Sequence, residues 1–299
     1  MAGSTRACAV IKAGARSAGG LWQRAAVRLR SRRSVRFSAG ALVVLVALAV
    51  LGPFASRWHF DAIDWQHLAQ APGAVAGHWF GTDRLGRDLF VRTLTGLRLS
   101  LLVSVLATLT SLVIGVTYGA IAGFTGGRTD ELMMRSVDVL YALPYLFIVI
   151  ILTSLLPRGS LTVLFVALGA VGWLTTARIV RGQTLALKRR DFIEAARALG
   201  VAPPAILMRH VLPNLIGTVI VYATLTVPQM ILFESFLSFL GLGVQEPRAS
   251  LGNLIAVGAQ EMSSAPWMLI APAAVLVLLL LCLNFLGDNL SDALDPREH

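Results

Sequence analysis

Charged side chains are scarce in this sequence. They make up 14% of its 299 residues, whereas hydrophobic residues make up 56%. A soluble domain carries roughly 25% charged residues. The shortage is uneven, because uncharged runs long enough to cross a hydrocarbon core of about 30 Å alternate with short charged segments. This excludes a large soluble core and predicts an all-α membrane protein with six transmembrane helices, at about residues 38–56, 100–123, 137–156, 161–180, 214–237 and 267–287.

Lysine, cysteine and histidine are also rare. Neither of the two lysines, Lys12 and Lys188, follows a glycine, so the Gly-Lys step of a phosphate-binding P-loop is absent. The two cysteines, Cys8 and Cys282, are too few for a disulfide framework. The five histidines show none of the spacings typical of a zinc enzyme. We therefore expect a non-catalytic chain that holds no cofactor or metal of its own.

Acidic residues are missing from the first part of the chain. Residues 1–38 contain nine basic residues and no acidic one. Positive charge beside the first span favours a cytoplasmic N-terminus, and six spans then return the C-terminus to the cytoplasm. Topology therefore explains the net charge of +10 without nucleic-acid binding. The predicted parts are a basic cytoplasmic tail (1–36), a first transmembrane helix (37–56), an extracytoplasmic segment (57–98), a five-helix core (99–290) and a cytoplasmic tail (291–299).

An amphiphilic segment separates the fourth and fifth predicted spans. Asp191 followed by Glu194 fits a helix N-cap with a capping box. Gly200 suits the left-handed residue that ends a helix. The sequence therefore predicts a two-turn helix over residues 192–199.

A second short helix is expected directly after the first. Pro204 is acceptable at a first helical position, and this helix should run to about Leu212. Pro213 is expected to break or kink the chain before the next span. Residues 191–213 are thus predicted to form a helix–turn–helix bracket that projects from the cytoplasmic membrane surface.

The charged stretch before the second span allows two interpretations. Thr82 or Asp83 could cap a helix, with apolar residues at three- and four-residue spacing behind it. In one interpretation Asp83, Arg87 and Asp88 form a polar cluster on the substrate path or gate. In the other, which we favour, they form ion pairs within an amphipathic helix at the membrane interface.

The fifth predicted span contains two unusual residues. Pro228 lies inside it, and Glu234 lies near its external end. A carboxylate in a membrane span is by default a functional hypothesis, which would place Glu234 with Pro228 on the gate or substrate path. An external interfacial position for Glu234 is the alternative, and the sequence leaves both open.

Several motifs resemble those of a known family. The spacing Glu194-Ala195-Ala196, Gly200 and Leu212-Pro213 resembles the EAA loop of bacterial ABC-importer permeases. The strings FGTDRLGRDLFVR, ARIVRGQTLALKRRDFIEAA, ILFESFLSFLGLGVQEP and GDNLSDALDP resemble the C-type permease subunits of oligopeptide and dipeptide ABC importers, most closely the oligopeptide ones. The resemblance covers about residues 79–296. It departs at Ala249-Ser250-Leu251-Gly252, which lacks the tryptophan often found before the glycine.

The resemblance implies a type I ABC importer permease fold in the bacterial cytoplasmic (inner) membrane. It implies a second homologous permease subunit, two cytoplasmic ATPase subunits that bind ATP and Mg²⁺, and an extracytoplasmic peptide-binding protein as partners. It also implies that the bracket is the coupling helix that docks on an ATPase. The residues expected to carry this coupling are Asp191, Glu194, Ala195, Ala196, Gly200 and Pro213.

The cargo follows from the resemblance alone. Oligopeptides are the expected cargo, and dipeptides, nickel chelates, glutathione or murein peptides are alternatives for the same architecture. An ion-coupled secondary transporter is a more distant alternative, because such proteins place ionisable residues near the bilayer midplane. The predicted spans have none there, and Glu234 is the nearest candidate.

Overall fold

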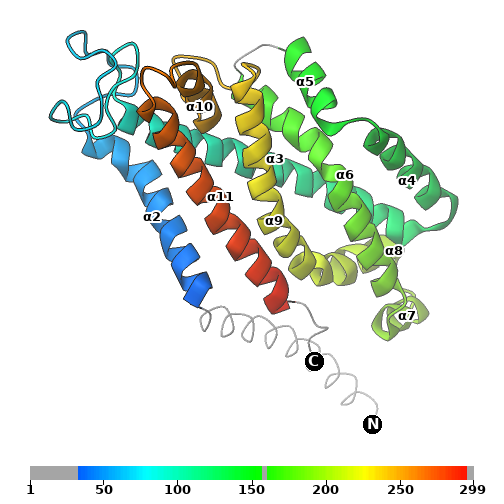
Figure 1. Cartoon of the computed structure of the whole chain (residues 1–299). Helices are drawn as coiled ribbons and strands as arrows, with labels where there is room; N and C mark the ends of the chain where they lie inside the picture. Colours follow the sequence, from blue (N-terminus) through cyan, green and yellow to red (C-terminus); the bar gives the residue numbers. More distant parts are fainter. Residues whose placement is uncertain (1–32, 157–159, 295–299) are drawn as a thin grey trace.

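Long helices that lie side by side dominate the computed structural model, which describes residues 33–156 and 160–294 (Figure 1). The predicted basic tail therefore lies almost wholly outside the described residues, as does most of the predicted C-terminal tail. The long helices are α2 (Arg33–Ala55), α3 (Leu89–Thr125), α6 (Leu161–Lys188), α9 (Leu212–Phe239) and α11 (Trp267–Leu294). The shorter ones are α4 (Gly127–Ala142), α5 (Tyr145–Leu155), α7 (Asp191–Ala198), α8 (Pro203–Ile206), the π-helix η1 (Leu207–Val211) and α10 (Leu251–Gln260).

The described residues form an all-helical protein without a named strand. Five helices are long and apolar enough to span a membrane, with α8, η1 and α9 counted as one. The pair α4 and α5 passes the same test together but is bent by 83°. Six spans are therefore present if this bent pair counts as one.

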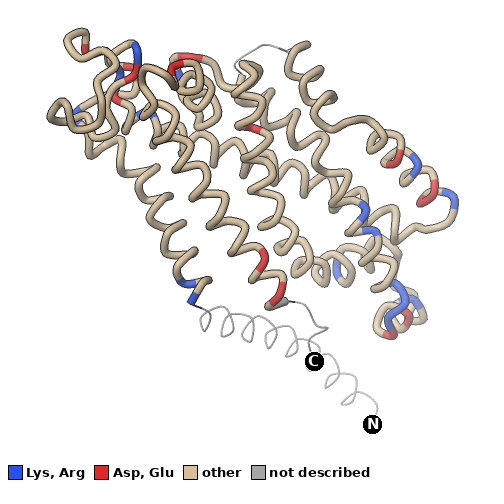
Figure 2. Tube along the Cα trace, in the orientation of Figure 1, with Lys and Arg blue, Asp and Glu red and all other residues tan. Residues whose placement is uncertain are grey.

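The two ends of the helix bundle differ in their structure. We call the end with residues 56–88 and 240–250 the loop end, and the end from which α7 projects the bracket end (Figure 1). Charged residues gather at these two ends, and the helices between them are almost free of charge (Figure 2). This distribution is the one expected for a membrane protein, because charge is costly in hydrocarbon.

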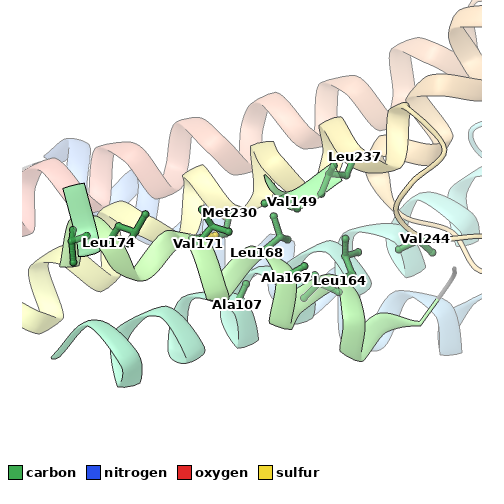
Figure 3. Close-up of a cluster of buried hydrophobic side chains, with 12 residues drawn as sticks. Ala107, Val149, Leu164, Ala167, Leu168, Val171, Leu174, Met230, Leu237 and Val244 are labelled. Atoms are coloured by element: carbon green, nitrogen blue, oxygen red, sulfur yellow. The ribbon is translucent and has the colours of Figure 1, made fainter. Parts of the chain in front are cut away.

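Close packing of α3 on α6 forms the centre of the bundle. Gly115, Gly119 and Gly123 of α3 face α6, and a Cβ atom at Gly119 would overlap the carbonyl of Ala177. Small residues at this spacing let two helices approach closely. The largest apolar cluster extends from this contact to α5 and α9, as Figure 3 shows for Ala107, Val149, Leu164, Ala167, Leu168, Val171, Leu174, Met230, Leu237 and Val244.

The third predicted span, 137–156, is not one helix. The chain becomes extended at Leu143 (φ −83°, ψ 137°) and at Pro144, between α4 and α5. Proline lacks an N–H donor and disfavours a helical conformation in the residue before it. The predicted kink at Pro144 is therefore a complete break.

The predicted start of the interfacial helix at Thr82 or Asp83 is also wrong. Asp88 is the N-cap, its carboxylate accepts a hydrogen bond from the Val91 N–H at 2.8 Å, and α3 then continues directly into the membrane. Gly86, at φ +78°, lies in the preceding turn. The side chains of Thr82 and Asp83 bind loop backbone instead of capping a helix.

Candidate coupling bracket and membrane cavity

Helix α7 is a two-turn helix that begins at Asp191. The predicted cap at this residue is wrong, because Arg190 is the N-cap and makes no capping side-chain bond. The C-terminal end follows the prediction, since Gly200 lies at φ +75°. The N–H of Gly200 donates to the Arg197 carbonyl (2.9 Å), and the N–H of Val201 donates to the Ala196 carbonyl (3.1 Å). These two bonds form a Schellman motif, which turns the chain back towards the bundle.

The two faces of α7 have different surroundings. Ile193 and Ala196 are buried against α3, η1 and the start of α9, in an apolar cluster that also contains Ala120 and Val211. Glu194 and the other side chains of α7 are exposed. Of the residues expected to carry coupling, Asp191, Glu194, Ala195 and Gly200 therefore lie on the open surface, and Ala196 faces the bundle.

Two exposed apolar side chains accompany Glu194 in this region. Phe192 is exposed at the start of α7, and Leu199, directly after it, is 83% exposed. The sequence analysis did not select either residue. The sequence contained one indication of them. Both are apolar, lie outside the helical face formed by Ile193 and Ala196, and occur in an otherwise charged segment.

Pro213 does not break the chain. It lies in the first turn of α9, where a missing N–H donor is tolerated. The preceding turn is the π-helix η1, and the N–H of Leu212 donates to the Leu207 carbonyl. The expected separate helix from Pro204 to Leu212 is thus continuous with the fifth span. Helices α8, η1 and α9 therefore follow one another without an intervening loop.

A cavity of about 470 Å³ lies between α6, α9 and the break between α4 and α5. Its wall combines apolar residues with hydroxyl, amide and aromatic groups, and among the described residues none that lines it is charged. The polar and aromatic residues of the wall are Tyr141, Tyr145, Thr175, Thr176, Tyr222, Thr226, Gln229 and Phe233. Tyr145 is fixed by a hydrogen bond to the Leu168 carbonyl (3.1 Å) and by stacking on Phe233.

The residues predicted for a gate or substrate path do not line this cavity. Pro228 is buried within α9. The cavity wall on α9 is formed instead by the helical face with Tyr222, Thr226, Gln229 and Phe233. Sequence reasoning missed these residues, although their spacing of three and four positions places them on one face of a helix.

Glu234 is fully buried on another part of α9. Its carboxylate accepts hydrogen bonds from the hydroxyl groups of Ser100 and Ser238, both at 2.7 Å. These hydroxyl oxygens accept in turn from the backbone N–H groups of Leu251 and Val244, both at 3.2 Å. Glu234 therefore joins α3 and α9 to the segment before α10 and does not line the cavity.

Asp83 and Arg87 belong to a buried ion-pair network at the loop end. The Nε atom of Arg87 lies 2.6 Å from a carboxylate oxygen of Asp83, and its Nη2 atom lies 3.0 Å from Glu246. Arg92, the most buried arginine, lies 3.6 Å from Asp83 and 3.7 Å from Glu246. The hydrogen bond from Arg87 lowers the pKa of Glu246 below its usual value. This network joins the segment before α3 to the segment before α10.

Asp88 has a separate set of partners. Besides capping α3, its carboxylate lies 2.7 Å from Nδ1 of the buried His78. The other ring nitrogen of His78 lies 3.5 Å from Asp64, and the ring stacks on Trp58. Hydrogen bonding to His67 is the main cause that lowers the pKa of Asp64. Asp83, Arg87 and Asp88 are thus held inside the fold of the loop end, away from the cavity.

No metal site is found in the part of the chain that the structure describes. No group of three or more histidine, cysteine, aspartate or glutamate side chains there is placed to hold an ion. The two candidate functional regions are therefore the bracket, which exposes carboxylate and apolar side chains, and the uncharged cavity.

Comparison with known proteins shows the family of the chain. Residues 115–299 match the family model "Binding-protein-dependent transport system inner membrane component", and residues 20–72 match "N-terminal TM domain of oligopeptide transport permease C". The chain is 49% identical over 278 residues to the oligopeptide transport system permease protein OppC of Escherichia coli K12, with 93% of this chain and 92% of the relative covered. The OppC protein of Haemophilus influenzae is 47% identical, with coverages of 93% and 89%.

Two further proteins with other names are also similar to this chain. The dipeptide transport system permease protein DppC of Bacillus subtilis is 45% identical over 273 residues, with 90% of this chain and 84% of the relative covered. Among solved structures, a chain of the MetNI methionine ABC transporter in an inward facing conformation matches with a TM-score of 0.54 and 20% identity. This match covers 69% of the chain described here and 96% of that chain, and it shows the fold alone.

Proposed function

This chain belongs to the family of binding-protein-dependent transport system inner membrane components, and we propose that it is the permease subunit of an ABC importer for oligopeptides. The chain itself supplies no nucleotide-binding loop, so the energy comes from partner ATPase subunits. A second, homologous permease subunit completes the transport path. A peptide-binding protein outside the membrane delivers the cargo.

The exposed surface of α7 is the observation that carries this proposal. A two-turn helix held rigidly by a buried face and a Schellman motif, with Glu194, Phe192 and Leu199 exposed, is suited to dock in a groove of another chain. The bracket end is then cytoplasmic, and the loop end faces the binding protein. This orientation agrees with the excess of basic residues in the segment around α7.

The residues that line the cavity are proposed to form part of the wall of the transport path. Hydroxyl, amide and aromatic groups without a fixed charge suit a cargo whose own side chains vary in charge, because no charge is repelled or trapped. Asp83, Arg87, Asp88 and Glu234 are proposed to hold the loop end together instead of contacting the cargo. The identity of 45% with a dipeptide permease favours dipeptides as the second candidate cargo.

The test is transport and ATP hydrolysis by the complex purified with its partner subunits and reconstituted in vesicles. Glu194→Ala should lower peptide-stimulated ATP hydrolysis and peptide uptake together, by about tenfold if it removes a charge-assisted contact of about 1.5 kcal/mol. The matched control is Asp288→Ala, which removes an exposed carboxylate from α11 at the same end of the bundle. The control should transport as the wild type does.

Two outcomes would contradict the proposal. If Glu194→Ala and the double variant Phe192→Ala with Leu199→Ala both retain full stimulated hydrolysis and uptake in assembled complexes, α7 is not the coupling element. If the wild-type complex takes up neither oligopeptides nor dipeptides, the proposed cargo is wrong.

A further inference from the structure

Helix α4 buries few of its side chains against the rest of the described chain. Only Asp130 and Val137 of its sixteen residues are buried. On the side that faces α6, the two helices enclose a hollow of about 270 Å³ lined by charged residues of both signs. The contact between α3 and α6 is different, because there glycines allow backbone to touch backbone.

Two ion pairs cross from α4 to α6, and we call them the α4–α6 latch. Arg181 of α6 donates from its Nε and Nη2 atoms to the two carboxylate oxygens of Asp130 of α4, at 2.6 and 2.7 Å. One turn away on α6, the Nη2 atom of Arg178 lies 2.7 Å from Asp138. The Arg178 guanidinium also covers the ring of Tyr141, 4.2 Å from its centroid.

The latch ends at the cavity wall. Tyr141 lines the cavity, its hydroxyl lies 3.5 Å from the hydroxyl of Thr175 across the gap, and two residues later α4 breaks at Leu143–Pro144. The break itself lines the cavity. Because α9 forms the other wall, a joint movement of α4 and α6 relative to α9 would change the width of the cavity.

Helix α6 connects the latch to the bracket. It is a single helix of 28 residues, about 42 Å long, that carries part of the cavity wall, then Arg178 and Arg181, and ends at Lys188. Helix α7 begins three residues later, at Asp191. Only the turn at Arg189 and Arg190 therefore separates α7 from the helix that carries the latch arginines.

Resting on the proposed function, we propose that the α4–α6 latch transmits the movement of α7 to the α4–α5 break and so sets the width of the cavity. Arg178, Arg181, Asp130 and Asp138 are positioning residues, because they act through α4 and do not touch the cargo. The α3–α6 pair moves as one body, and α4 follows it as long as the latch is closed.

The proposal predicts loss of coupling without loss of ATP hydrolysis. Removing one partly exposed ion pair shifts an equilibrium by about two- to fivefold. The double variant Arg178→Ala with Arg181→Ala should therefore lower the amount of peptide taken up per ATP hydrolysed by about fivefold or more.

Exchanging the charges of one pair, with Arg178→Asp and Asp138→Arg together, should restore most of the coupling that Arg178→Asp alone removes. The matched control is Arg128→Ala, an exposed arginine of α4 that does not line the hollow and forms no ion pair with the described residues.

A distance measurement separates the latch from a purely structural role. Spin labels at the exposed positions Ser136 of α4 and Gln183 of α6, with Cys8 and Cys282 replaced by serine, report the separation of the two helices in the whole complex. The separation should stay the same with and without ATP in the wild type, and its distribution should broaden in the double variant. If that variant does not assemble, Asp138→Asn keeps the shape of the side chain and should broaden the distribution to a smaller extent.

The outcomes for the latch and for the proposed function are distinct. Wild-type uptake per ATP and an unbroadened distance distribution in the assembled latch variants would overturn the latch. Failure of the wild-type complex to take up peptide would overturn the proposed function, and the distance distributions would still decide whether α4 follows α6.

Discussion

The loop end and the bracket end of this molecule are built in opposite ways. At the loop end, charged side chains are buried against one another, and the segment before α3 is tied to the segment before α10 through Arg87, Arg92 and Glu246. At the bracket end, most of α7 is exposed and α4 is attached by ion pairs beside a polar hollow. The loop end uses its charged side chains for contacts within the protein. The bracket end leaves charged and apolar side chains exposed.

This difference shows which charges belong to the fold and which are available for function. Removing one partner of a buried pair leaves an uncompensated charge, so the damage is to stability. Removing an exposed charge changes stability little, so any effect on transport reports a contact with a partner. The following three predictions test this distinction, from the largest expected effect to the smallest.

Arg87→Ala should destabilise the protein most. It leaves the more distant Arg92 as the only charged partner of the buried Asp83 among the described residues, and the loss of one partner of a buried ion pair costs about 3–5 kcal/mol. Thermal unfolding in detergent measures the change. The control is Arg84→Ala, an exposed arginine three residues earlier, which should shift stability by less than about 0.5 kcal/mol. Equal effects of the two changes would show that the loop-end network is not a buried one.

Gly200→Ala should have an intermediate effect confined to the bracket. A residue with a side chain pays about 1–2 kcal/mol at the left-handed φ of +75° found there. Nothing lies within 4 Å of a Cβ atom at this position, so the backbone conformation alone is tested. Gly182→Ala, in the interior of α6 with similarly open space, should instead stabilise by about 0.5–1 kcal/mol. Hydrogen exchange of the α7 amides measures the first change, and the melting temperature measures the second. A protected α7 in Gly200→Ala would contradict the Schellman ending.

The smallest effect is expected from the pH dependence of Glu246. Its pKa is lowered in the folded protein by the hydrogen bond from Arg87, so its contribution to stability is present above the unfolded pKa, near 4.5, and is lost as the pH falls through the folded pKa. The melting temperature of the wild type should therefore fall more steeply below about pH 4.5 than that of Glu246→Gln. Parallel curves for the two proteins would show that the ion pair between Glu246 and Arg87 does not contribute to stability.

The sequence predicted the membrane class, the positions of five long spans and the short helix before the left-handed Gly200. These features depend on local rules, because apolar length decides whether a helix can span and a glycine is required where φ is positive. The family motifs predicted the importer permease, which the relatives confirm. The coupling role of Glu194 and its neighbours remains a prediction.

Other features could not be obtained from local rules. The capping residue of α3 is Asp88 and not Thr82 or Asp83, because the earlier side chains are used by the loop that folds back on them. Glu234 could be placed only with its partners known, since Ser100 lies 134 residues away in the chain. The choice between an exposed, interfacial and enclosed carboxylate depends on such distant contacts.

What the sequence determined by itself is therefore the five long apolar helices and the short helix α7, because hydrophobic length and periodicity act within a single segment. The tertiary structure alone decided that the span around Pro144 breaks by 83°, that this break lines an uncharged cavity, and that Arg178 and Arg181 meet carboxylates on α4. Each of these depends on how separate helices pack, and the packing energy of one helix is set by residues that lie elsewhere in the chain.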